Sequence, residues 1–173
     1  RTLLSIDKYA QKFNLFGLDV SNAFARAEVD EDLYVEQPHG YVKLDAHGKP
    51  YVCKLKKGLY GTKQAARLWN RKFRLTLLTS GWRQLESDPC IYSRHTPTHG
   101  WEILGVYVDD IIHLCKHKST HDQFLVLCNS QFPSTSQGEL TWVLQMHVSR
   151  DFDNQILNLD QTQAILSYLN TVN

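Results

Sequence analysis

Two adjacent acidic residues interrupt a β-prone stretch near the middle of the chain. Residues 103–114 read Ile-Leu-Gly-Val-Tyr-Val-Asp-Asp-Ile-Ile-His-Leu, so Asp109 and Asp110 fall between two apolar segments. Two such segments with turn-forming residues between them predict a β-hairpin whose turn holds the acid pair. A third carboxylate, Asp19, lies at or near the end of another β-prone run, residues 16–20.

These three carboxylates predict a divalent-cation site if the fold brings them together. Like charges at neighbouring strand ends repel one another, and a hard cation such as Mg²⁺ relieves that repulsion through oxygen ligands. Two such ions held by carboxylates can support in-line phosphoryl transfer. The alternative is a structural role, because Asp side chains commonly stabilise turns by hydrogen bonding to nearby backbone.

Positive charge is concentrated in residues 54–74. This stretch contains eight basic residues and no acidic one, with Tyr60 and Trp69 interleaved, whereas residues 28–36 contribute five acids. A basic stretch with aromatic side chains could hold a phosphate backbone. The alternative is a solvated helix face together with a basic loop. The basic residues are Lys54, Lys56, Lys57, Lys63, Arg67, Arg71, Lys72 and Arg74.

The elements that must position these residues form a mixed pattern. Strand-like runs alternate with helical stretches, and several strands are close enough in sequence for hairpins. This predicts an α+β fold, a small antiparallel sheet with helices packed on one face. We expect helices at 2–13, 62–79, 119–131 and 161–171, and strands at 16–20, 33–36, 51–55, 90–93, 103–108, 111–115, 142–148 and 156–159.

Size and composition fit one globular domain over residues 1–173. Hydrophobic residues make up 42% of the chain, and 19 Lys and Arg against 18 Asp and Glu leave a net charge of +1. This balance excludes a globally basic nucleic-acid binder, although it does not exclude a local patch.

Four cysteines without a C-x-x-C pair predict reduced thiols and an intracellular protein. No apolar run is long enough for a membrane span, so we expect no membrane partner.

A zinc site is the competing metal hypothesis, because His113, His117 and His121 are spaced four residues apart with Cys115 between the first two. Since His113 falls in a predicted strand, helical spacing would not bring all three to one ion. The sequence therefore favours exposed or core-edge histidines.

Five motifs follow one another along the chain. They are Leu18-Asp-Val-Ser-Asn-Ala-Phe24, Tyr34-Val-Glu-Gln-Pro-His-Gly-Tyr41, Cys53-Lys-Leu-Lys-Lys-Gly-Leu-Tyr-Gly-Thr-Lys-Gln-Ala-Ala-Arg-Leu-Trp69, Asp88-Pro-Cys-Ile-Tyr92 and Tyr107-Val-Asp-Asp110. Their order resembles the copia-type LTR-retrotransposon reverse transcriptases, and the resemblance covers nearly the whole chain. It implies a right-hand polymerase palm, and the activity of an RNA-directed DNA polymerase that transfers nucleotides to a primer 3′-hydroxyl by a two-metal mechanism.

The resemblance also implies roles for individual residues. Asp19, Asp109 and Asp110 would be the catalytic aspartates that bind Mg²⁺, with Mn²⁺ as a substitute, and Asp19 and Asp109 would be the more direct ligands. In the nucleotide site, the Val20 carbonyl would face the second metal, and Phe24 would exclude a ribose 2′-hydroxyl. The positions that would lie under template and incoming nucleotide are Tyr60, Gly61 and Gln64 for the nucleotide, and Lys63 and Arg67 for nucleic acid.

The implied partners are an RNA or DNA template with its primer, deoxynucleotide triphosphates, and the remaining polyprotein segments (fingers, RNase H and integrase). We expect a palm-centred fragment without the N-terminal part of the fingers and without the thumb, since Arg1 is not Met and residue 1 adjoins a predicted helix. The implied location is a cytoplasmic virus-like particle or the nucleus.

Two segments depart from the family pattern. Ala23-Phe-Ala-Arg-Ala27 stands where the family reads A-F-L-x-G, and Val143-Leu-Gln-Met146 stands where it reads F-L-G-I, a hairpin that grips the primer. These departures favour a second hypothesis, a catalytically silent remnant that binds nucleic acid or has a structural role. The three intact aspartates favour the enzyme.

Overall fold

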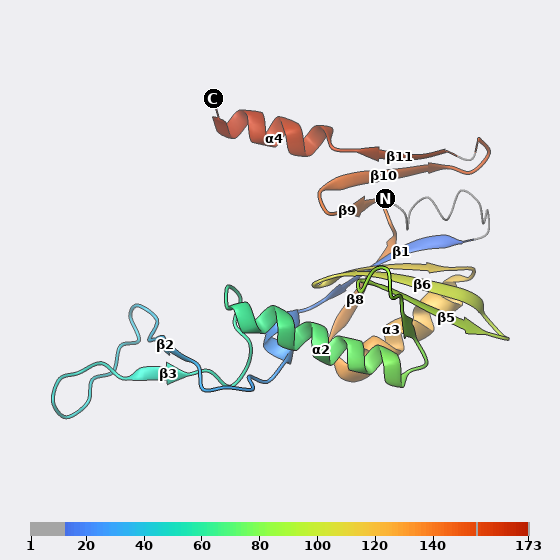
Figure 1. The fold of residues 1–173 in the computed structure, drawn as a ribbon. Helices are drawn as coiled ribbons and strands as arrows, with labels where there is room; N and C mark the ends of the chain where they lie inside the picture. Colours follow the sequence, from blue (N-terminus) through green and yellow to red (C-terminus); the bar gives the residue numbers. More distant parts are fainter. Residues whose placement is uncertain (1–12, 155, 173) are drawn as a thin grey trace. The chain divides into compact units, whose positions relative to one another are not determined.

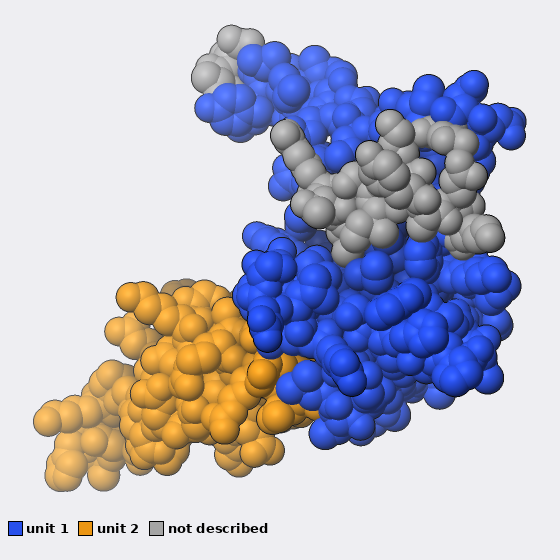
Figure 2. All heavy atoms as spheres, turned by 45° about the vertical axis from the view of Figure 1, so that its right-hand side comes forward, with its two compact units in different colours: residues 1–21, 78–173 blue, residues 22–77 orange. Residues whose placement is uncertain are grey.

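The computed structural model describes residues 13–154 and 156–172, so the helix predicted at 2–13 lies almost entirely outside the described residues. The described chain is an α+β protein with antiparallel sheets (Figure 1). It divides into two compact units, residues 1–21 with 78–173 and residues 22–77 (Figure 2). The prediction of a single domain over residues 1–173 stays a prediction.

The first unit is built on a six-stranded antiparallel sheet in the order β4-β5-β6-β7-β1-β8. Helix α3 (Lys118–Gln131) packs on one face of this sheet, as the sequence predicts, and buries Phe124 and Cys128. The strands are β1 (Asn14–Val20), β4 (Arg83–Gln84), β5 (Ile91–Thr96), β6 (Gly100–Tyr107), β7 (Asp110–Cys115) and β8 (Ser134–Glu139).

The opposite face of the sheet carries a separate group of apolar side chains. Leu15 of β1 is the register partner of Leu114 of β7, and both are fully buried. They cluster with Leu140, Val143 and Val148, which belong to the segment that follows β8. The cluster thereby attaches β9 (Trp142–Val143) and β10 (Met146–Asp151) to the face opposite α3.

A second sheet continues from this attachment. Strands β9, β10 and β11 (Ile156–Asp160) form an antiparallel sheet in the order β11-β10-β9, and α4 (Thr162–Val172) follows β11 (Figure 1). Within residues 13–154 and 156–172, no helix combines the length and the apolar character that a membrane crossing requires.

The second unit contains a two-stranded ribbon and most of a long helix. Strands β2 (Tyr34–Glu36) and β3 (Val52–Lys54) pair antiparallel, and α2 (Lys63–Thr79) buries Trp69 and Phe73 on one side. A short 3-10 helix, η1 (Ala23–Arg26), precedes the ribbon.

The sequence predictions fail at three places in the first unit. Strand β8 has no apolar alternation, because Ser134–Glu139 reads Ser-Thr-Ser-Gln-Gly-Glu, and it was therefore not predicted. The predicted strand at 142–148 is wrong as a single element, because a turn at Leu144 and Gln145 divides it into β9 and β10. The short strand β4 was also missed.

A chain of buried polar side chains crosses the face beneath α3. Arg94 donates two hydrogen bonds to Glu102, at 3.0 and 2.9 Å, and His113 Nε2 faces a Glu102 oxygen at 3.4 Å. The Nδ1 atoms of His113 and His121 lie 3.2 Å apart, and His121 Nε2 lies 2.8 Å from the Ser136 hydroxyl. The prediction of exposed or core-edge histidines is wrong for these two, which are 0% and 1% exposed.

One arrangement of protons fits the hydrogen bonds of His121 with both histidines neutral, and it leaves His113 Nε2 facing Glu102 without a hydrogen bond. Ser136 donates to His121 Nε2, His121 Nδ1–H donates to His113 Nδ1, and His113 Nε2–H points at Glu102. An added proton would break this sequence of donors and acceptors. Burial, opposed in part by Glu102, leaves the pKa of His113 below its usual value. Burial and the neighbouring His113 lower the pKa of His121 to about 4.

We expect acid to destabilise the first unit through these histidines. A histidine that titrates near 6.5 when unfolded and near 4 when folded contributes its full stability above pH 6.5 and loses it as pH falls toward 4. The loss is at most about 3 kcal/mol for His121. Urea unfolding between pH 8 and pH 4 measures it.

The control is a second histidine on the same segment. His121→Gln should flatten the acid limb of the pH profile, even though the variant is less stable at pH 7. The same change at exposed His117, which precedes α3, should leave the profile intact. Equal acid slopes for the wild type and His121→Gln would contradict the assignment.

Candidate active site

The strand register brings Asp19 and Asp110 side by side. Asp19 of β1 is the register partner of Asp110 of β7, and Tyr107 of β6 is the register partner of Asp110 on the other side. The Val20 N–H donates a hydrogen bond of 3.0 Å to the Asp109 carbonyl oxygen, which ties the β6–β7 turn to the end of β1. Direct register partners project to the same face of a sheet, so Asp19 and Asp110 share the face opposite α3.

The turn that presents Asp109 has a strained backbone. The two central residues of this turn are Val108 and Asp109, and Asp110 is the first residue of β7. The turn therefore lies one residue earlier in the chain than predicted, because the sequence placed it at Asp109 and Asp110. Val108 has a φ of 57°, in the left-handed region that a β-branched residue rarely adopts. Such strain persists only where the surrounding structure imposes it, and here the pairing of β6, β7 and β1 does so.

The pKa values of two of the three aspartates are raised in the described structure. Partial burial and the Asp109 charge raise the pKa of Asp19, and partial burial, Asp109 and Asp19 raise the pKa of Asp110. Within residues 13–154 and 156–172, no Lys, Arg or His forms an ion pair with any of the three. Among the described residues, no side chain therefore pairs with these carboxylates to offset their repulsion.

The side chains do not form a closed ligand cage. Over the described part of the chain, no group of three or more His, Cys, Asp or Glu side chains has metal-binding geometry. This includes the histidine hypothesis, since His113 and His121 meet beneath α3 while His117 stays exposed. Carboxylate oxygens are the ligands that Mg²⁺ prefers, so the donor set fits this ion, and binding it would have to draw the carboxylates closer.

The other predicted nucleotide-site residues lie in the second unit, except Val20, which is buried at the end of β1. Phe24 is half-buried and meets the Tyr60 ring edge-on, with ring centroids 4.6 Å apart. Gly61 has a φ of +88°, which favours glycine, and Gln64 is half-buried in the first turn of α2. The pairing of Phe24 with Tyr60 was not predicted.

The predicted nucleic-acid contacts differ in their surroundings. Lys63 and Arg67 are both exposed on α2, four residues apart. Arg67 donates to both carboxylate oxygens of Asp30, at 3.0 and 3.2 Å, and lies 3.6 Å from Glu31. Lys54 likewise pairs with Asp32 at 2.6 Å. The acids of residues 28–36 thus neutralise part of the basic stretch, which the sequence pattern alone did not reveal.

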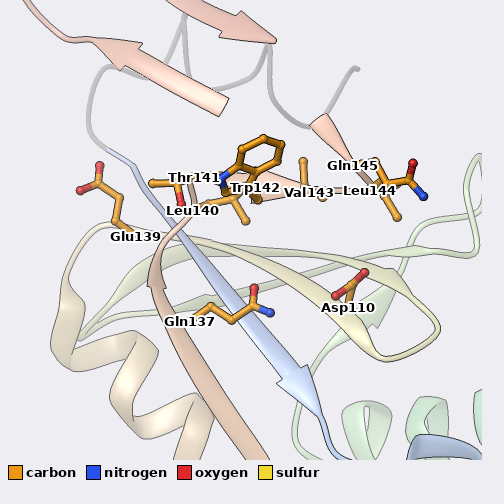
Figure 3. A pocket seen from close by; sticks show the side chains of 9 residues that line it. All are labelled: Asp110, Gln137, Glu139, Leu140, Thr141, Trp142, Val143, Leu144 and Gln145. Carbon is orange, nitrogen blue, oxygen red and sulfur yellow. The ribbon is translucent and has the colours of Figure 1, made fainter. Parts of the chain in front are cut away.

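A pocket of about 370 Å³ lies next to Asp110 in the first unit (Figure 3). It is bounded by Asp110, by Gln137 and Glu139 of β8, and by the segment from Leu140 to Gln145. The turn at Leu144 and Gln145 has positive φ at both residues, 46° and 64°. Sequence reasoning missed Gln137, because the polar strand that carries it gave no periodic signal.

Comparison with known proteins decides the family. The reverse transcriptase (RNA-dependent DNA polymerase) family matches residues 1–173. The chain belongs to this family. It is 32% identical, over its whole length, to a retrovirus-related Pol polyprotein from transposon TNT 1-94 of Nicotiana tabacum, and 34% identical over 90% of its length to one from transposon RE1 of Arabidopsis thaliana.

A putative transposon Ty5-1 protein of Saccharomyces cerevisiae is 30% identical over 88% of this reverse transcriptase chain. The chain spans 13% and 10% of the two plant Pol polyproteins and 47% of the yeast protein. No solved structure matches the chain. The predicted resemblance to copia-type retrotransposon reverse transcriptases is confirmed.

The electrostatic coupling of the aspartates can be tested directly. In the reverse transcriptase chain without divalent cations, Asp109→Asn should lower the pKa of both Asp19 and Asp110, because the Asp109 charge raises both. Side-chain carboxyl titration by NMR measures the two values. Asp122→Asn, which removes an acid paired with Lys118 on α3, is the control and should change neither pKa. Unchanged values in Asp109→Asn would show that the turn holds its carboxylate away from the others.

The β9–β10 turn predicts a gain in stability on substitution. Gln145 has a positive φ, so Gln145→Gly should raise the free energy of unfolding by about 1 kcal/mol. Gln145→Ala removes the same side chain without relieving the backbone and should give no such gain. Urea unfolding at constant m-value compares the three proteins. A gain in the alanine variant equal to that in the glycine variant would assign the effect to the side chain.

Proposed function

We propose that this chain is the palm of an RNA-directed DNA polymerase, which adds deoxynucleotides to a primer 3′-hydroxyl by a two-metal mechanism. The observation that carries the proposal is the register of β1 against β7, which pairs Asp19 with Asp110 and hydrogen bonds Val20 to the turn residue Asp109. Membership of the reverse transcriptase family supports it.

In this proposal Asp19, Asp109 and Asp110 hold Mg²⁺, for which Mn²⁺ can substitute. The bound ions would activate the primer hydroxyl and stabilise charge on the phosphates of the nucleotide. The contribution of the described residues is to hold carboxylate oxygens on adjacent strands without pairing them to a cationic side chain. The raised pKa values of Asp19 and Asp110 fit a site that is completed by an external cation.

The second unit would contribute the nucleotide and template contacts. Phe24, braced by Tyr60, presents a bulky ring that would exclude a ribose 2′-hydroxyl. Gly61, Gln64 and Lys63 stand at or before the first turn of α2, where exposed backbone N–H groups favour anions. Arg67 would have to exchange Asp30 for a phosphate in order to contact nucleic acid.

Primer extension tests the proposal. With the complete Pol enzyme, a primed RNA template, deoxynucleotides and Mg²⁺, Asp19→Asn and Asp109→Asn should each reduce extension to background, because each removes a charged metal ligand. Asp122→Asn on α3 should retain extension. Chelation of Mg²⁺ should stop the wild type, and Mn²⁺ should restore it. Extension by either active-site variant at the wild-type rate would overturn the proposal.

The 173-residue chain alone should extend a primer feebly or not at all. The polymerase reaction depends on positioning that contributes about 7–11 kcal/mol, and the chain spans only 10 to 13% of the two plant Pol polyproteins. Robust Mg²⁺-dependent extension by the chain alone, lost in Asp109→Asn, would contradict this expectation.

A catalytically silent nucleic-acid-binding remnant is the second candidate function. The strained Gln145, at the hairpin where the family has glycine, favours it. Both functions predict salt-dependent binding of a primer–template duplex, and replacing Lys63 and Arg67 by Ala should weaken binding and flatten the salt slope. Only the polymerase hypothesis predicts that the complete enzyme extends a primer.

A further inference from the structure

A second pocket lies at the β4 edge of the six-stranded sheet, at the other end of the strand order from β8. It has a volume of about 370 Å³ and shares no lining residue with the pocket at Asp110. Trp101, one of its lining residues, stands six residues before Tyr107, the register partner of Asp110, and so lies about 20 Å along β6 from the aspartates. The lining residues are Gly81, Arg83, Ser93, Arg94, His95 and Trp101.

Strand register places four of these side chains on one face of the sheet. Arg83 of β4 is the register partner of Ser93 of β5, and His95 of β5 is the register partner of Trp101 of β6. Ser93 and His95 are two residues apart, so all four project to the same face. Trp101 shares this face with Ile103, which packs against the apolar cluster opposite α3. The pocket therefore opens on the face that also carries the aspartates.

Contacts on the other face hold this edge of the sheet in place. Trp82 is buried and meets Phe124 of α3 edge-on, with ring centroids 5.5 Å apart. The Arg94 guanidinium lies 4.6 Å from the centroid of the Trp82 ring and pairs with the buried Glu102. Because Trp82 is held toward α3, the next residue, Arg83, projects to the opposite face.

The pocket combines an unpaired cation with an exposed aromatic ring. Arg83 is exposed, and across the described residues its guanidinium forms no ion pair. Arg94 also lines the pocket, but Glu102 balances its charge. The Trp101 side chain is 56% exposed, and its ring is tilted against the His95 ring with centroids 5.0 Å apart. No Asp or Glu lines the pocket, so nothing in its wall repels a phosphate.

This chemistry favours single-stranded nucleic acid. A guanidinium binds phosphate oxygens, and an exposed indole ring stacks on a base. Arg83 and Trp101 lie two strands apart, about 10 Å, so a short stretch of one strand reaches both. A base in a duplex is already stacked and paired, whereas an unpaired base can turn its face to an aromatic side chain.

We infer that this pocket is a second nucleic-acid contact, which holds single-stranded nucleic acid by stacking an unpaired base on Trp101 and binding a phosphate at Arg83. The inference goes beyond the proposed function, because it requires neither the metal site nor the basic residues of α2. It adds a place where a strand lies over the aspartate face, about 20 Å from the aspartates.

Binding of a short labelled single-stranded oligonucleotide to the 173-residue chain, followed by fluorescence anisotropy across a salt titration, tests the inference. Trp101→Ala should weaken binding roughly 5- to 100-fold at every salt concentration and leave the slope of log affinity against log salt unchanged. Arg83→Gln should weaken binding and make the slope less steep by about 0.7, because one phosphate contact is lost.

A second readout reports on the ring itself. The bound base should quench the indole fluorescence of the wild type. Trp101→Phe keeps an aromatic ring and should retain most of the affinity, yet it should lose this quenching. Binding by Trp101→Phe as weak as that of Trp101→Ala would contradict stacking.

Three controls localise the effect. Tyr168→Ala removes an exposed aromatic ring from α4 and should bind the oligonucleotide like the wild type. Lys118→Gln removes a cation from α3, on the opposite face of the sheet, and should leave the salt slope unchanged. A blunt-ended duplex offers no unpaired base, so Trp101→Ala and the wild type should bind it equally.

The other outcomes overturn the inference in identifiable ways. Unchanged binding in both Trp101→Ala and Arg83→Gln would exclude the pocket as a nucleic-acid contact, and an equal loss on single strand and duplex would exclude base stacking. Displacement of the oligonucleotide by an equal concentration of a nucleoside monophosphate would mean a mononucleotide site. No effect of either variant, with Trp101 shielded from a soluble quencher in the complete Pol enzyme, would mean that another polyprotein segment covers the pocket. Primer extension that depends on Asp109 would leave the proposed function standing in every case.

Discussion

The antiparallel register of β1 against β7 is the constraint on which the site depends. It pairs Asp19 with Asp110 at one end and Leu15 with Leu114 toward the other. Because side chains alternate along a strand, a slip of one residue would turn Asp19 toward α3 and remove Leu15 from the apolar cluster on the other face. Burial of the leucine pair therefore fixes the position of the aspartates, which lie four residues away along each strand. Burial of apolar surface opposes a charge repulsion that would otherwise separate the strands.

Charged side chains have partners on one face of the sheet and lack them among the described residues on the other. Beneath α3, Glu102 is fully buried but is held by Arg94 and faces His113, and burial of the two histidines favours their neutral forms. On the other face, no residue that the structure describes pairs with Asp19 or Asp110 in this way, and the pKa values of both are raised. A buried charge that has partners stabilises one packing of α3 on the sheet. Carboxylates without partners repel one another, and an external cation would relieve that repulsion.

Irregular backbone is concentrated around the pocket at Asp110. Val108 and Gln145 adopt positive φ in the two hairpin turns, and β8 bulges at Gln137 opposite Gly17. Regular structure supports all three irregularities. The six-stranded sheet holds Val108 and the bulge at Gln137, and the apolar cluster that contains Val143 and Val148 flanks Gln145. Strain of this kind costs about 1–3 kcal/mol per residue and survives only with such support.

The sequence alone determined the local elements and the family. Helices α2, α3 and α4 and strands β1, β2, β3, β7 and β11 begin and end within about two residues of the predicted ranges, because apolar periodicity is a local property. The three aspartates could also be identified, since their motifs are contiguous.

The tertiary structure decided the rest. Strand β8 is polar and becomes a strand only by hydrogen bonding to β1, and Arg67 meets Asp30 across 37 residues. His113 and His121 pair beneath α3 from different elements. These contacts join residues that are distant in the chain, and no periodicity within a short window records them.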